Sequence, residues 1–89
     1  MLLQQLRDEI DTLDTQLLDI FEKRMKISSE ILQYKLENNL PIEDTKRETQ
    51  LIKKISTAAS EELVKYDKKL FSEIISLSKE YQKQKMIKE

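Results

Sequence analysis

Two cationic residues, Arg24 and Lys35, stand on one stripe of a segment whose apolar pattern predicts a single long helix. Eleven residues make about three helical turns, so the two side chains point within roughly 20° of each other and start about 16 Å apart. Arg24 also falls on an apolar position of the pattern between Ile20 and Ile27, where a charge is costly unless an anion pairs with it. The spacing therefore predicts that both side chains converge on a small dianion.

Each of these cations also has an ordinary structural interpretation. Arg24 alone is equally compatible with an ion pair to a buried glutamate, or with a side chain that reaches solvent at the edge of a helix contact. Lys35 alone is typical of a solvated charge near the C-terminal end of a helix, where the helix dipole favours it. The dianion site thus depends on the two residues taken together.

Hydrogen-bonding residues end an apolar stripe in the C-terminal segment. Phe71, Ile75, Ser78 and Gln82 follow helical spacing, and Ser78 and Gln82 lie one turn apart on the same face. The stripe is apolar at its start and polar at its end, as the wall of a polar pocket would be. The alternative is the ordinary change from an apolar face to a solvated helix end.

A cluster of charges opens the middle segment. Asp44, Arg47 and Glu48 share the helix face that Leu51 continues. Thr45 with Glu48 fits a capping box, and Asp44 is equally explained as a helix cap. The pair Arg47 and Glu48, at the head of an inward face, is a further candidate for ligand binding.

Composition removes many kinds of chemistry. The 89 residues include no cysteine, histidine or glycine, which excludes a thiolate nucleophile, a zinc ribbon, an imidazole base and a phosphate-binding loop. We therefore expect neither a metal nor a cofactor. Only three of the 16 basic residues are arginines, at Arg7, Arg24 and Arg47, so arginine is placed where its forked geometry matters.

The elements that position these residues are helices. Turn residues separate three helical patterns, predicted at about 3–36, 44–58 and 61–85, in a single all-α domain over 1–89. Asn38, Asn39 and Pro41 end the first pattern, and residues 56–60 contain the second turn. The first pattern is a heptad seam of Leu3, Leu6, Ile10, Leu13, Leu17, Ile20, Ile27, Ile31 and Tyr34. The second helix is predicted to turn Leu51, Ile52 and Ile55 inward. The third helix is predicted to carry one apolar seam of Leu63, Leu70, Ile74, Leu77 and Tyr81.

The length of the first helix predicts a homodimer. Thirty-four residues make a rod of roughly 50 Å, whereas a compact domain of this size is about 30 Å across. The overhanging apolar seam needs a partner, and a second copy is the simplest one. A plain coiled-coil tether is the alternative.

The chain has a net charge of -1 and no long apolar run, so we expect it to bind neither nucleic acid nor a membrane. A cytoplasmic location is the default prediction.

The ordered set of these residues resembles the all-helical, AroQ-type chorismate mutases over nearly the whole chain. It comprises Arg7 in Leu-Arg-x-x-Ile-x-x-Leu-Asp, Glu22-Lys23-Arg24, Lys35, Pro41-Ile42-x-Asp44-x-x-Arg47-Glu48 and Leu70-Phe71-x-x-Ile74-Ile75-x-x-Ser78-x-x-x-Gln82. The stretch between the second and third helices is slightly shorter than in the family pattern.

The resemblance implies an intertwined homodimer of three-helix subunits, the chorismate mutase II fold, that converts chorismate to prephenate in phenylalanine and tyrosine biosynthesis. It assigns the substrate carboxylates to Arg7 and Arg24 with help from Ser78, and the ether oxygen to Lys35 and Gln82. It assigns the ring hydroxyl to Glu48. Asp44 and Arg47 complete that end of the site, and Ile31 and Ile75 form apolar walls.

Helix geometry bears on the role of Arg7. Arg7 and Arg24 are 17 residues apart, which separates them by about 25 Å and roughly 100° on one helix. They cannot grip one small ligand from the same helix, so we expect Arg7 to act across the dimer interface.

The reaction suits this composition. A Claisen rearrangement breaks one C–O bond and forms one C–C bond within a single molecule. It requires a held conformation and donors at the ether oxygen, with no nucleophile or metal. Two other functions remain open: an isochorismate-pyruvate lyase of the same fold, and a non-catalytic helical regulatory module of a shikimate-pathway enzyme.

Overall fold

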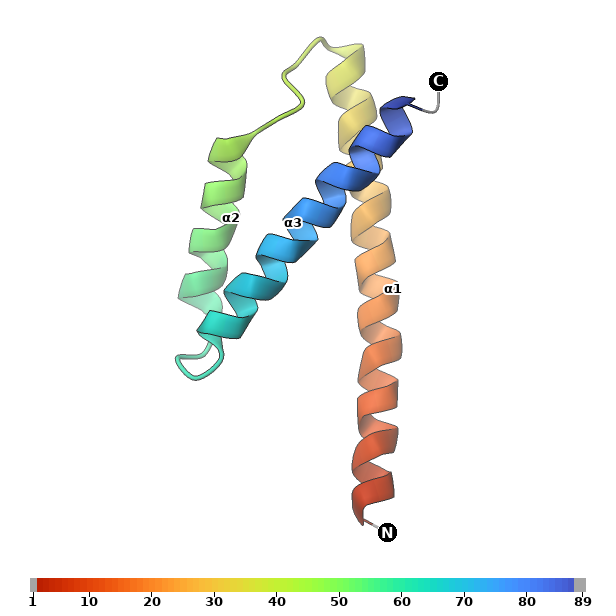
Figure 1. Ribbon diagram of the computed structural model, residues 1–89, viewed down its shortest axis with the longest axis vertical. Coiled ribbons are helices and arrows are strands. Elements are labelled where there is room, and N and C mark those ends of the chain that lie inside the picture. Colours follow the sequence, from red (N-terminus) through yellow and green to blue (C-terminus); the bar gives the residue numbers. More distant parts are fainter. Residues whose placement is uncertain (1, 88–89) are drawn as a thin grey trace.

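The computed structural model describes residues 2–87, which form three α-helices and no strand (Figure 1). Helix α1 spans Leu2–Glu37, α2 spans Thr45–Ala58 and α3 spans Val64–Ile87. The predicted all-α class with a long first helix is confirmed. The third helix begins three residues later than predicted, because residues 61–63 form a turn closed by a hydrogen bond from the Val64 N–H to the Ser60 carbonyl (2.9 Å).

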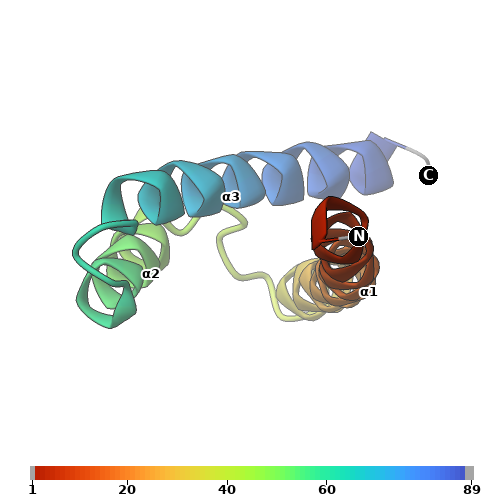
Figure 2. The ribbon, with the colours of Figure 1, turned by 90° about the horizontal axis from the view of Figure 1, so that it is seen from below.

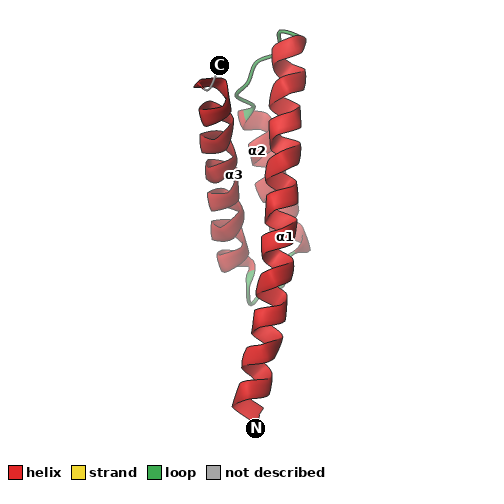
Figure 3. Cartoon of the chain, turned by 90° about the vertical axis from the view of Figure 1, so that its right-hand side faces the viewer, coloured by secondary structure: helices red, strands yellow, loops and turns green. Residues whose placement is uncertain are grey.

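Helix α1 extends well beyond the other two helices. Its 36 residues make a rod of about 54 Å, and the chain measures 56 × 29 × 15 Å. The radius of gyration is 16.4 Å, against about 12 Å for a compact chain of this length. The N-terminal part of α1 projects past α2 and α3 in both side views (Figures 1 and 3).

Helix α3 joins the other two helices. It crosses both α1 and α2 on one side (Figure 2), and among residues 2–87 the two helices it bridges do not contact each other directly. Its contact with α1 involves the stretch of α1 that carries Arg24, Met25 and Ser28, which exchange hydrogen bonds with Ser78 and Gln82. The C-terminal half of α1 is therefore the part that the chain itself covers.

Few apolar side chains are buried within the chain. Among residues 2–86, Leu32 is the one buried apolar side chain, at 3% exposure. Every member of the predicted α1 seam is between 47% and 61% exposed. Leu63 and Leu70, on the seam predicted for the third helix, are also about half exposed. Leu51, Ile52 and Ile55 on α2 are half-buried, as are Ile74, Leu77 and Tyr81 on α3.

Local chemistry explains where α1 ends. Asn39 has a φ of 54°, a left-handed conformation that Asn tolerates better than most residues. The Leu40 N–H donates to the Lys35 carbonyl (2.9 Å) and the Asn39 N–H to the Leu36 carbonyl (3.4 Å), which is the Schellman arrangement. Pro41 follows directly, as the sequence predicts.

Asp44 caps α2. Its carboxylate accepts a hydrogen bond from the Arg47 backbone N–H at 3.0 Å, which satisfies one of the free N–H groups of the first turn. The expected capping box between Thr45 and Glu48 is wrong, because Thr45 is already the first helical residue. Within the described residues, no helix is both long enough and apolar enough to cross a membrane.

Candidate active site

A pocket of about 440 Å³ lies between the C-terminal half of α1, the start of α2 and the C-terminal half of α3. The sequence predicts ten site residues, and nine of them line this pocket. They are Arg24, Ile31, Lys35, Asp44, Arg47, Glu48, Ile75, Ser78 and Gln82. The helical spacing that aligned Arg24 with Lys35, and Ile75 with Gln82, thus brings both stripes to one cavity.

At one end of the pocket, Arg24 is held by a buried serine. Its Nη1 donates to Ser78 Oγ at 3.0 Å, and Ser78 is 8% exposed. The Ser78 hydroxyl donates in turn to Met25 Sδ at 3.6 Å. Arg24 is half-buried and faces the pocket, so the alternative of a buried ion pair with glutamate is not realised among the described residues. The guanidinium has five N–H donors, which leaves several for a carboxylate.

Two further hydrogen-bond donors, Lys35 and Gln82, line the pocket. Lys35 Nζ donates to the Ile42 carbonyl at 3.2 Å. Gln82 Nε2 donates to the carbonyl of Ser28 at 3.0 Å and to its Oγ at 3.1 Å. Ser28 is buried, so its two oxygens fix the orientation of the Gln82 amide. Both donors are therefore held close to the cavity before any ligand contact.

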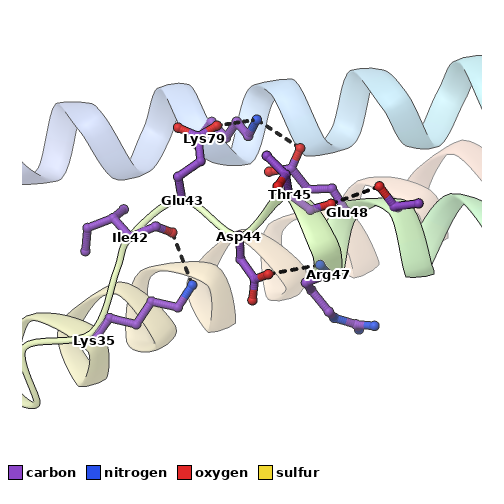
Figure 4. A network of polar contacts seen from close by, with 9 residues as sticks. Lys35, Ile42, Glu43, Asp44, Thr45, Arg47, Glu48 and Lys79 are labelled. Carbon is purple, nitrogen blue, oxygen red and sulfur yellow. Dashed lines mark hydrogen bonds and ion pairs between the residues drawn. The ribbon is translucent and has the colours of Figure 1, made fainter.

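The other end of the pocket contains an ion-pair cluster (Figure 4). Lys79 Nζ lies 2.9 Å from Glu48 Oε1 and 3.1 Å from Glu43 Oε1. Hydrogen bonds to Glu48 and then to Glu43 raise the pKa of the Lys79 ammonium above its usual 10.5. The cluster joins α2, the α1–α2 connection and α3.

Lys79 and Glu43 were not predicted from the sequence. Lys79 follows Ile75 by four residues, so it lies on the same helix face as the predicted stripe, and that spacing was an available signal. Glu43 lies in the connection between two helices, where no periodicity applies. Ser28 lies on the helix face between Arg24 and Lys35, but its bond to Gln82 depends on the crossing of α1 and α3.

Asp44 and Arg47 line the edge of the pocket. The Asp44 carboxylate is engaged as the α2 cap, which supports the structural interpretation given above. The Arg47 side chain is exposed and points away from the Lys79 cluster in Figure 4. Neither side chain makes an ion pair within the described residues.

Arg7 is exposed on the projecting part of α1 and does not line the pocket of its own chain. This placement agrees with the helix geometry that separates it from Arg24 by about 25 Å.

The pocket is positively charged on a chain that is slightly negative overall. Five cationic residues line it, against three acidic ones, for a formal charge of +2 where the whole chain has -1. The cationic residues are Arg24, Lys35, Arg47, Lys79 and Lys83, and the acidic ones are Glu43, Asp44 and Glu48. Such a site favours a small anion with two negative groups over a neutral or cationic ligand.

Comparisons with known proteins agree with this geometry. The family model described as chorismate mutase type II matches residues 6–83, a range that contains all ten predicted site residues. A bifunctional chorismate mutase/prephenate dehydratase from Buchnera aphidicola subsp. Baizongia pistaciae (strain Bp) is 35% identical over 71 residues. That match covers 78% of this chain and 19% of the relative, so the chain spans about a fifth of the relative's length. No solved structure matches the chain.

Proposed function

The chain belongs to the chorismate mutase type II family, and from this premise we propose that it is an isomerase that converts chorismate to prephenate. The observation that carries the proposal is the convergence of nine predicted residues on one pocket with a formal charge of +2. Chorismate carries two carboxylates, an ether oxygen and a ring hydroxyl, and the pocket offers groups of matching chemistry for one carboxylate, the ether oxygen and the hydroxyl.

We assign the roles along the pocket. Arg24, fixed by Ser78, binds one carboxylate through its forked N–H groups. Lys35 and Gln82 donate to the ether oxygen, on which negative charge develops as the C–O bond breaks. Glu48 accepts from the ring hydroxyl. Ile31 and Ile75 supply apolar walls that favour the compact chair-like conformation in which the new C–C bond forms.

The roles assigned above leave the second carboxylate of the substrate without a partner. We propose that Arg7 of a second copy binds it, in a homodimer that pairs the exposed seams of α1. The support is physical: apolar side chains along α1 are about half exposed, and apolar surface removed from water stabilises association by roughly 25 cal/mol per Å². The cytoplasmic location stays a prediction of the sequence.

The direct test is the disappearance of chorismate and the appearance of prephenate with purified protein. We expect turnover well above the uncatalysed rate. A parallel assay with isochorismate, with pyruvate as the measured product, separates the lyase. A chain that binds chorismate but converts neither compound is a regulatory module.

Mixing two inactive variants tests the shared site. Arg7→Ala and Arg24→Ala each remove a different side of every site in a pure dimer. In an equal mixture about half of the dimers are mixed, and each of these has one intact site, so about a quarter of wild-type activity returns. A mixture that stays as inactive as the two separate variants contradicts the shared site. Turnover of chorismate by the wild-type protein tests the proposed reaction independently.

A further inference from the structure

Lys79 is the one cation of the ion-pair cluster, and the roles assigned above leave it unused. We propose that Lys79 is a positioning residue that holds the Glu48 carboxylate ready for the ring hydroxyl of the substrate and does not itself bind the substrate. The inference rests on the proposed function, because it deepens the role given to Glu48.

The geometry favours action through Glu48. The Lys79 ammonium lies 2.9 Å from Glu48 Oε1, and within residues 2–87 this ion pair is the side-chain contact that Glu48 makes. One carboxylate oxygen is thus fixed by Lys79, and Oε2 is left to accept a hydrogen bond from a hydroxyl. Lys79 belongs to α3 and Glu48 to α2, so the pair also sets the position of the first turn of α2 against α3.

Charge argues against direct substrate binding by Lys79. Glu43 Oε1 lies 3.1 Å from the same ammonium, so two carboxylates face one cation. Their combined charge outweighs the cation, which leaves it with little attraction for a dianion. Arg24 and Lys35, in contrast, make their hydrogen bonds to neutral oxygens.

The cluster keeps its charge over the working range of an enzyme. Because both glutamates raise the pKa of Lys79 in the folded chain, the Lys79 ammonium keeps its charge at neutral pH and loses its proton only as the pH rises through a folded-state pKa above 10.5. The other charged groups that face this pocket are Arg24, Lys35, Glu43, Asp44, Arg47 and Lys83.

Kinetics of Lys79→Met provide the first test. The ring hydroxyl neither forms nor breaks a bond in the rearrangement, so we expect its contact with Glu48 to be similar in the ground state and the transition state. We expect KM to rise about tenfold with kcat within a factor of about two. Lys79→Arg keeps a cation at this position and is expected to restore KM. Lys68→Met, on the exposed side of α3, is the control for the loss of one positive charge.

A double-mutant cycle separates action through Glu48 from direct action. If Lys79 works through Glu48, adding Lys79→Met to Glu48→Gln has little further effect on KM. An undiminished tenfold effect in the double variant means that Lys79 acts on the substrate itself and overturns the proposal. Glu43→Gln leaves the Lys79–Glu48 pair in place, so its KM is expected to stay near wild type. If the KM of Glu43→Gln were as high as that of Lys79→Met, the effect of Lys79 would instead come from its ion pair with Glu43 in the α1–α2 connection, and the proposal would be overturned.

A titration that needs no turnover completes the test. The Lys79 side-chain NMR signals of ¹³C-labelled protein, assigned by their loss in Lys79→Arg, give its pKa directly. We expect this pKa to fall in Glu48→Gln, and to fall less in Glu43→Gln. An unchanged pKa in Glu48→Gln overturns the coupling even in an active enzyme. Absence of chorismate turnover in wild type would overturn the proposed function and leave the titration result intact.

Discussion

At the scale of single residues, the most buried polar side chains support the site. Ser28 and Ser78 are 9% and 8% exposed, and with Leu32 they are the buried residues among 2–86. Ser28 fixes the Gln82 amide, and Ser78 fixes the Arg24 guanidinium. The contact between α1 and α3 therefore orients hydrogen-bond donors at the positions where an ordinary helix pair would pack apolar side chains.

Gln82→Glu should make activity depend on acid. An amide donates a hydrogen bond at any pH, whereas a carboxyl donates only when protonated, and its ordinary pKa is about 4.3. We expect kcat to rise as the pH falls from 8 to 5, where wild type stays nearly flat. Melting temperatures over the same range check that folding is not the cause. A flat profile for the variant would contradict the ether-oxygen role.

Arg24→Ala should be the most damaging change inside the pocket. It leaves a substrate carboxylate without its partner in a partly desolvated site, which costs about 2–5 kcal/mol of transition-state stabilisation. The measurement is kcat/KM for chorismate, with circular dichroism as the folding check. Arg24→Lys keeps the positive charge but loses the forked geometry, so its kcat/KM should lie between that of wild type and that of Arg24→Ala. Near-normal turnover in Arg24→Ala would rule out the assigned site.

Residue types and helical spacing were enough to predict nine of the residues that line the pocket, but not the bonds between the helices that form it. Arg24 with Lys35 and Ser78 with Gln82 share stripes that periodicity reveals. The bonds from Gln82 to Ser28 and from Lys79 to Glu48 join residues on different helices. Those pairings follow from the crossing of the helices, on which a single sequence pattern carries no information.

At the scale of elements, the connection between α1 and α2 sets one wall of the pocket. Asn39 turns the chain in a left-handed conformation, the Ile42 carbonyl accepts from Lys35, and Asp44 starts the next helix. Three local interactions within a few residues thus place Glu43 and Glu48 beside Lys79.

Substitution at Asn39 tests the importance of this turn. Asn39→Ala should lower the free energy of unfolding by about 1 kcal/mol, because a Cβ without a polar tip disfavours the left-handed conformation. Asn39→Gly, which takes that conformation freely, should be neutral or stabilising. Urea denaturation measures both. Equal stabilities for Ala and Gly at this position would show that the turn is not populated in solution.

Helix ends were easier to predict than helix faces. Asn, Pro and a Ser/Thr/Ala stretch mark the ends to within three residues. None of the apolar seam predicted on α1 is buried inside the chain, and its role as a contact surface stays a prediction. A neighbouring stripe of α1 faces the rest of the chain instead. Met25 and Ser28 on this stripe bond to α3, and Leu32 is buried. The exposed seam and the stripe that faces α3 lie side by side on α1, so the spacing of apolar residues alone did not distinguish them.

At the scale of the whole molecule, the chain has little interior of its own. One buried apolar side chain among residues 2–86 and a radius of gyration of 16.4 Å fit a subunit that is stabilised by association. The homodimer proposed above would cover the exposed seam and bring Arg7 to the other pocket.

The melting temperature should therefore rise with protein concentration. Leu13→Glu, in the middle of the exposed seam, should weaken association and lower the melting temperature, because it places charge in an apolar contact. Thr15→Glu lies on the opposite face of α1 and is the matched control. Sedimentation analysis reads the assembly state. A monomeric wild type with a concentration-independent transition would contradict the dimer.

The thickness of the chain has a consequence for its backbone amides. At 15 Å in its shortest dimension, the subunit is only two helix layers thick, with α3 on one side of α1 and α2 (Figure 2). Over the projecting part of α1, no other helix of the same chain shields the backbone from solvent (Figure 3). Protection of those amides from deuterium exchange would then measure how long two copies stay together, and the labelling rate of one helix would serve as a clock for subunit dissociation.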